Sequence, residues 1–157
     1  MVKKSRCVRI RALACGLGLA LLASSAHALF IVNQPWVRPA QSGQSTELYM
    51  NLTSTDGATL LDLRTDAATT VVLRGPGRTA RTIPELALPA GEQVALSPGN
   101  ARVGLLRLNR TLKFGDHIAV TLTIRGADGA NLNVPLSVEA RWRSAEDDHK
   151  LPHHHAH

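Results

Sequence analysis

The stretch 118-IAVTLTIRGADGANLNVPLSVEARW-142 carries the clearest structural signal in the sequence. Apolar and polar residues alternate along it, which is the period-two pattern of strands with one buried face. Residues 126–129, Gly-Ala-Asp-Gly, interrupt the alternation with turn formers, so the stretch predicts a β-hairpin. The residues expected to face the core are Ile118, Val120, Leu122 and Ile124 on one strand, and Leu132, Val134, Leu136, Val138, Ala140 and Trp142 on the other.

Shorter runs of the same kind recur upstream, separated by residues that favour turns. No stretch of a dozen residues keeps the apolar spacing of a helix. The pattern therefore predicts an all-β fold, an antiparallel β-sandwich or barrel of about eight strands. The upstream strands are expected at Phe30–Val37, Glu47–Leu52, Thr59–Leu63, Thr69–Arg74, Gln93–Leu96 and Arg102–Leu108.

The N-terminus has the layout of a signal peptide. Five basic residues precede an uncharged apolar run, Leu13 to Ala23, and small residues follow it up to Ala28. We expect cleavage after Ala28, which makes residues 1–28 a leader and sends the chain to the periplasm. Cleavage after Ala26 is the alternative, and it would leave His27 as a copper-chelating N-terminus. The apolar run is short for a membrane span, so no stable membrane anchor is expected after cleavage.

Removing the leader changes both the charge and the cysteine content. Thirteen basic and twelve acidic residues remain of the eighteen and twelve in the whole chain, so the net charge falls from +6 to about +1. No basic stripe with interleaved aromatics is left, which argues against nucleic-acid binding. Cys7 and Cys15 both leave with the leader, so neither a disulfide nor a thiolate is expected. Cys15 begins the apolar stretch instead of following it, so a lipid anchor is not expected.

The alternation stops after Trp142, and residues 143–157 offer little to bury. We therefore predict three segments: the leader at 1–28, one folded domain at 29–142, and a disordered histidine-rich tail at 143–157.

Three stretches of the domain resemble the periplasmic copper chaperone family PCu(A)C. Their order and spacing agree with that family over roughly Phe30 to Val138. The resemblance implies a cupredoxin-like β-sandwich and a role in copper handling. The stretches are Pro35–Ala40 with Tyr49-Met50, Leu88–Gly91 with Leu96–Gly99, and Leu105-Leu106 with Leu112–Asp116.

The same resemblance implies where copper ligands should lie, namely a His, a Met and a later His-x-Met pair. Cu(I) prefers such thioether and imidazole donors. Here the first His corresponds to Arg74, the pair corresponds to Arg102 and Gly104, and the segment that should hold the middle Met is shortened. Met50 belongs to the core signature. Because arginine stays protonated, the domain is expected to have lost the Cu(I) site.

Two arginines at former ligand positions allow two interpretations. They could converge on a carboxylate, a phosphate or an acidic partner surface. The interpretation favoured by the sequence is simpler, because single arginines on strand faces are commonly solvated.

The tail holds the one dense cluster of metal-ligating side chains, beside Glu146-Asp147-Asp148. Imidazole and carboxylate donors suit Cu(II), Zn and Ni, and intrinsic affinity favours Cu(II). Binding should fade below about pH 6 as the imidazoles protonate. An expression-tag remnant or a merely soluble tail is the alternative, although Leu151-Pro152 and Ala156 interrupt the run. The expected ligands are His149, His153, His154, His155 and His157, whereas His117 is interpreted as structural.

The expected function is a periplasmic copper-binding protein that holds Cu(II) mainly through its tail and either stores it or passes it to a periplasmic copper-accepting protein. A metal-free binding or assembly module that uses the altered corner is the alternative. An enzyme is not expected, because the domain has no nucleophile motif, no metalloprotease helix and no phosphate-binding loop.

Overall fold

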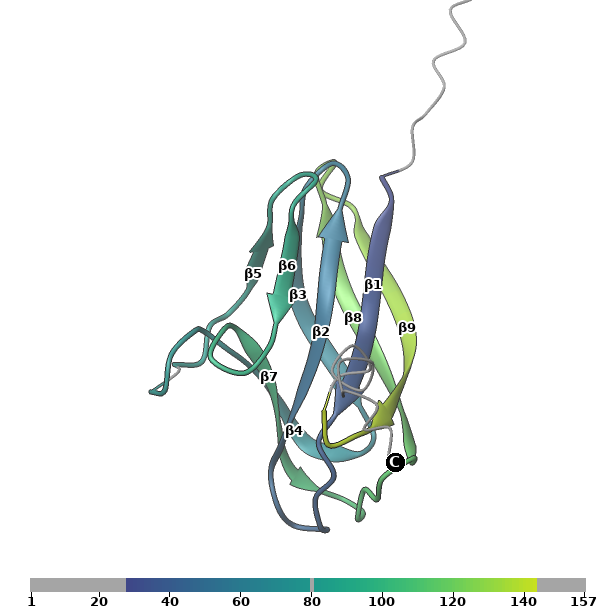
Figure 1. Cartoon of the computed structure of the whole chain (residues 1–157). Helices are drawn as coiled ribbons and strands as arrows, with labels where there is room; N and C mark the ends of the chain where they lie inside the picture. The colour runs from purple at the N-terminus through teal and green to yellow at the C-terminus, as the bar shows by residue number, and fades with distance from the viewer. Residues whose placement is uncertain (1–27, 80, 144–157) are drawn as a thin grey trace, which may run out of the picture.

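The computed structural model describes residues 28–79 and 81–143, so the expected leader apart from Ala28 and the expected tail apart from Arg143 lie outside the described residues. Every regular element within these ranges is a strand (Figure 1). The strands are β1 (Phe30–Val37), β2 (Thr46–Ser54), β3 (Ala58–Thr65), β4 (Ala68–Arg74), β5 (Leu86–Leu88), β6 (Gln93–Leu96), β7 (Arg102–Leu108), β8 (His117–Gly126) and β9 (Asn131–Ala140). The all-β class is confirmed.

The strands form one sheet that curls into a nearly closed barrel-like sandwich (Figure 1). Its order is β4-β7-β2-β1-β9-β8-β3-β5, and β6 pairs with β2. Most strand pairs are antiparallel as expected, but β1 and β9 run parallel where Trp36 lies opposite Glu139. Two strands far apart in sequence can pair in parallel because the intervening chain crosses the barrel. The apolar core lies inside the curl.

The predicted hairpin is confirmed as β8 and β9, with Ile118 opposite Val138 and Leu122 opposite Val134. The expected inward residues of β8 are buried, as are Val138 and Ala140. Val134 and Leu136 are only partly buried, and two expected core residues are exposed, Leu132 at 52% and Trp142 at 68%. β1 pairs with β9 only at the end of β9, through Trp36–Glu139 and Val37–Ala140. Leu132 lies on the part of β9 that pairs with β8 alone. Trp142 lies beyond the end of the strand.

Strand β5 is absent from the sequence prediction. It spans three residues, Leu86–Leu88, and pairs with β3 through Ala58 and Leu88. Three residues are too few to display an alternation, so only pairing with a neighbour identifies them as a strand.

The inward face of β2 is buried, with Met50 on it, and the outward face is buried at Tyr49. Met50 is 2% exposed, which confirms its place in the core. A bulge in β1, where Gln34 has a φ of 51°, shifts the register between Asn33 and Trp36. Trp36 consequently lies opposite Tyr49 and covers it from outside.

Within residues 28–79 and 81–143, no helix has the length and apolar character needed to cross a membrane.

Candidate functional site

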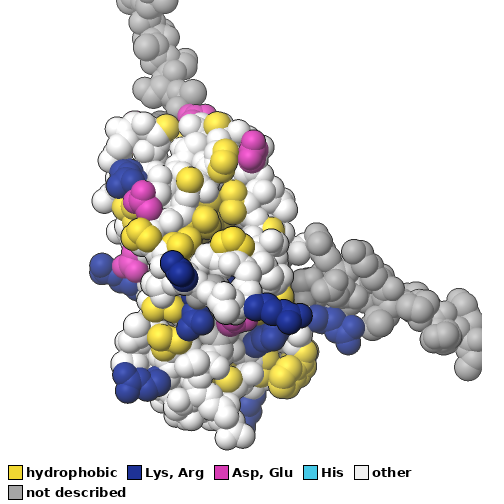
Figure 2. All heavy atoms as spheres, turned by 90° about the vertical axis from the view of Figure 1, so that its left-hand side faces the viewer, with side chains coloured by type: hydrophobic (Ala, Val, Ile, Leu, Met, Phe, Trp, Pro, Cys, Tyr) yellow, Lys and Arg dark blue, Asp and Glu magenta, His cyan; other side chains and the backbone are white. Residues whose placement is uncertain are grey.

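One outer face of the sheet gathers charged side chains from three neighbouring strands, β4, β7 and β2, and from Arg38, which directly follows β1. Arg74 lies opposite Arg102, and Glu47 lies opposite Gly104. Because side chains two residues apart on a strand share a face, these groups and Tyr49 point the same way. Figure 2 shows basic side chains gathered around a small acidic patch on this side of the molecule. We call this surface the arginine face, and it comprises Arg38, Glu47, Tyr49, Arg74, Arg78, Arg102 and Gly104.

The three positions that the resemblance assigns to copper ligands lie together on this face. Arg74 and Arg102 are cross-strand partners, and Gly104 lies two residues further along β7, on the same face. A β-carbon on Gly104 would lie 3.2 Å from Nε of Arg74 and 3.0 Å from Cγ2 of Val72. The Arg74 side chain therefore lies close against a residue that has no side chain of its own.

Arg102 is not a solvated strand-face residue, so the simpler interpretation of it is wrong. Its Nε donates to Oε1 of Glu47 over 2.8 Å, and its side chain is 11% exposed. Its terminal nitrogens donate at 3.3 Å to the backbone carbonyls of Gly77 and Asn100. The guanidinium thus binds a carboxylate of its own chain. This partner could not be predicted from the sequence, because Glu47 is 55 residues away from Arg102 and lies in a strand without an unusual pattern.

Glu47 is ionised and held from two sides. Burial would raise its pKa, but hydrogen bonds from Tyr49 and Arg102 and the charges of Arg102 and Arg38 outweigh burial and keep the pKa below 4.5. The Tyr49 hydroxyl donates to the carboxylate, and burial together with this bond raises the pKa of the phenol.

The Tyr49 ring links this network to β1. It packs against Trp36 with ring centroids 4.6 Å apart and planes inclined by 43°. The Arg38 guanidinium lies 5.5 Å from the centre of the same ring, within the range of a cation–π contact. The aromatic pair thus fixes the base of the face and places Arg38 above it.

The remaining arginines leave positive charge in excess. Nε of Arg74 is buried and has no hydrogen-bond partner within the described residues. Arg38 and Arg78 are exposed. Four guanidinium groups therefore face one carboxylate, and a buried donor without a partner is unfavourable unless something pairs with it.

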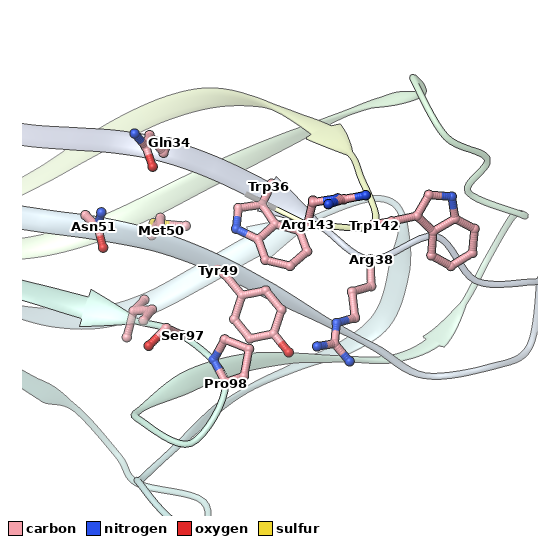
Figure 3. A pocket seen from close by; sticks show the side chains of 11 residues that line it. Gln34, Trp36, Arg38, Tyr49, Met50, Asn51, Ser97, Pro98, Trp142 and Arg143 are labelled. Atoms are coloured by element: carbon pink, nitrogen blue, oxygen red, sulfur yellow. The ribbon is translucent and has the colours of Figure 1, made fainter. Parts of the chain in front are cut away.

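Three adjoining hollows open on this side and share Arg38. The first, of about 430 Å³, is lined by Arg74, Glu47 and Gly104, and the second, of about 280 Å³, by Arg78, Arg102 and Tyr49. The third, of about 310 Å³, lies over Trp36 and Tyr49 and is bordered by Trp142 and Arg143 (Figure 3). The last described residue, Arg143, therefore lies at the edge of the arginine face.

The described residues contain no group of three or more His, Cys, Asp or Glu side chains close enough to hold a metal ion. His117 is exposed at the start of β8, and its backbone carbonyl accepts a hydrogen bond of 3.1 Å from Arg110. The five expected tail ligands, His149, His153, His154, His155 and His157, lie outside the described residues.

Comparisons with known proteins agree on one fold. The family model LpqE-like, described as "Putative lipoprotein LpqE-like", matches residues 31–136. An apo PCuAC domain from PmoF1 is 20% identical with a TM-score of 0.59, over 73% of this chain and 100% of that chain. The copper-bound PCuAC domain from PmoF2 is also 20% identical, with a TM-score of 0.56, over 73% and 99%.

A further match is the solution structure of CuI-DR1885 from Deinococcus radiodurans, which is 28% identical with a TM-score of 0.59. That match covers 76% of this chain and 85% of the other. The comparison with curated proteins found no relative. The chain therefore has the fold of PCuAC domains.

Proposed function

The chain belongs to the LpqE-like family, and from that premise we propose that it is an exported copper-handling protein that binds Cu(II) mainly through its histidine-rich tail. The proposal places it in the periplasm, with copper as cargo to be stored or passed to a copper-accepting protein there. It assigns the ion to His149, His153, His154, His155 and His157, with Zn and Ni as weaker occupants.

The observation that carries this proposal is the chemistry of the arginine face. Arg74 and Arg102 occupy two of the positions where the resemblance implies copper ligands, and a guanidinium is a cation that offers hydrogen-bond donors and no lone pair to a metal ion. Arg102 is also committed to Glu47. A cation approaching the two hollows that Arg74 and Arg102 line would meet an excess of positive charge, and no thioether lines these hollows among the described residues. Imidazole ligands are instead concentrated in the tail.

Two of the similar structures support copper as the metal. One is described as a copper-bound PCuAC domain and another as the CuI form of DR1885. Both descriptions concern those proteins. They favour copper over other divalent ions for this chain because the fold is shared.

The proposal is tested by titrating the mature chain with Cu(II), and with Cu(I) under reducing conditions. A form ending at Arg143 keeps all nine strands and is the first comparison. A full-length form with all five tail histidines changed to Gln is the second. We expect at least one Cu(II) per full-length chain, loss of that binding in both variants, and little Cu(I) bound by any form.

The matched control is H117Q, which removes an exposed histidine of the folded domain and should leave Cu(II) binding unchanged. Binding should also fall as the pH is lowered through about 6, since each imidazole must be neutral to coordinate. Tight Cu(I) binding by the form ending at Arg143, or no copper binding by the full chain, would contradict the proposal.

A second candidate function is a metal-free binding module that uses the arginine face. Two observations favour this function. Nε of Arg74 has no hydrogen-bond partner among the described residues, and the guanidinium of Arg38 is exposed, so both can bind an anionic group. The copper titration separates the two candidate functions. If the full chain binds no copper, the metal-free binding function remains.

A further inference from the structure

The arginine face has more positive charge than its own carboxylate neutralises. Arg102 is paired with Glu47, whereas Arg38 and Arg78 are exposed at the rim of the same hollow. Nε of Arg74 has no hydrogen-bond partner among the residues that the structure describes. A carboxylate that reached this face would meet Arg74 on β4 and Arg38 directly after β1, and the held backbones of these two donors lower the entropy cost of binding it.

We infer that the partner of the arginine face is the acidic segment of this chain's own tail, Glu146-Asp147-Asp148. The described chain ends at Arg143, which borders the same hollow as Arg38 (Figure 3). The acidic segment starts three residues later in the sequence. At about 3.3 Å per extended residue, Glu146 can lie roughly 10 Å and Asp148 roughly 17 Å beyond Arg143. The face is therefore within reach of all three carboxylates.

The short connection makes even a weak contact effective. Each exposed ion pair contributes little binding free energy, so a few such pairs would not hold a separate peptide at ordinary concentrations. A segment tethered by a few residues has an effective concentration of the order of millimolar. Several weak pairs to Arg38, Arg74 and Arg78 would then suffice to keep the segment on the face for much of the time.

This contact would bring the first tail histidine, His149, to the side of the domain where the resemblance places the ancestral copper ligands. The tail and the domain would then act as one unit and not as two independent parts. The inference uses the face of the second candidate function and does not depend on copper, because the carboxylates make the contact and the histidines do not.

The test compares the full-length mature chain with the variant E146Q/D147N/D148N. The readouts are the NMR resonances of Arg38, Arg74 and Tyr49 and the fluorescence of Trp36 and Trp142, the two tryptophans of the sequence. We expect the variant to shift these resonances and the emission maximum. Wild type in 0.5 M NaCl should show the same shifts, since salt screens exposed charges.

The matched control is D56N/D66N/E92Q, which removes three exposed carboxylates from turns elsewhere on the domain and should leave the signals unchanged. A hexa-aspartate peptide provides a second measurement. It should bind E146Q/D147N/D148N at least about fivefold more tightly than wild type, because the tail no longer competes. When R38Q/R74Q/R78Q is introduced into both chains, this difference in peptide affinity should disappear.

Identical spectra for wild type and the tail variant, or equal peptide binding by both, would overturn the inference. The form with five histidines changed to Gln separates this outcome from failure of the copper proposal. It keeps the acidic segment, so it should show wild-type resonances at the arginine face whether or not wild type binds copper.

Discussion

Arg74 and Arg102 lie directly opposite each other on β4 and β7. Like charges in such a cross-strand pair are destabilising. The conflict is relieved in two ways: Arg102 binds Glu47 at 2.8 Å, and Arg74 lies against Gly104, where no side chain competes for space. Glu47 and Gly104 therefore stabilise this pair of arginines, and substitutions at either position should lower the free energy of unfolding.

Removing the carboxylate at position 47 should destabilise the fold. E47Q leaves the Arg102 guanidinium, whose side chain is 11% exposed, with a neutral acceptor. We expect a loss of about 1–3 kcal/mol in the free energy of unfolding, measured with urea. The control is D62N, which breaks the pair with Arg64 where the side chains are 46% and 79% exposed and should cost less than about 1 kcal/mol. Equal losses would contradict the role assigned to Glu47.

Acid should weaken the fold through the same carboxylate. The pKa of Glu47 is lower in the folded state than its ordinary value of 4.5, so the unfolded chain takes up its proton first as the pH falls. The stabilisation is fully present above pH 4.5 and is lost as the pH falls through the folded-state pKa. Urea unfolding at pH 7, 5, 4 and 3 should show a smaller acid-induced loss in E47Q than in wild type. Equal acid-induced losses of stability in E47Q and wild type would contradict this role of Glu47.

A side chain at position 104 should be costly because of Arg74. The β-carbon of G104A would lie 3.2 Å from Nε of Arg74 and 3.0 Å from Val72, closer than most such contacts. We expect destabilisation by about 1–2 kcal/mol, as for other overpacked sites. In a double-mutant cycle, R74A should relieve part of that loss. A purely additive cycle would mean that Arg74 does not occupy the space over Gly104.

Restoring copper ligands on the arginine face should restore Cu(I) binding. R74H/R102H/G104M places two imidazoles and a thioether at the positions that the resemblance assigns, and these positions are adjacent on β4 and β7. Cu(I) favours both donor types. We expect Cu(I) bound under reducing conditions by a form that ends at Arg143. The control R74Q/R102Q/G104A removes the charges without adding ligands, and it should bind none.

The exported protein is predicted to begin at Leu29. Mass spectrometry of the secreted chain should show a start at Leu29, and a start at His27 would support the alternative cleavage after Ala26. The matched family model describes a lipoprotein, so a lipid-modified Cys15 is the outcome that would contradict the expected leader.

The sequence by itself predicted the strands well where they are long. β1 and β7 match the expected bounds, and the β8–β9 hairpin has the expected turn, because a half-buried strand must alternate and a turn needs residues such as Gly129. It failed for β5, which is too short to alternate, and for Leu132 and Trp142, whose apolar character is not matched by a covering layer.

What only the tertiary structure decided is the chemistry of the corner. The sequence determined that Arg74, Arg102 and Gly104 replace ligand types, because residue identity alone settles whether a side chain can give up a proton or supply a sulfur. The sequence could not show that Arg102 pairs with Glu47, or that Nε of Arg74 is buried without a partner among the residues that the structure describes. Those facts depend on which strands lie side by side, and pairing between distant strands is set by the packing of the whole sheet.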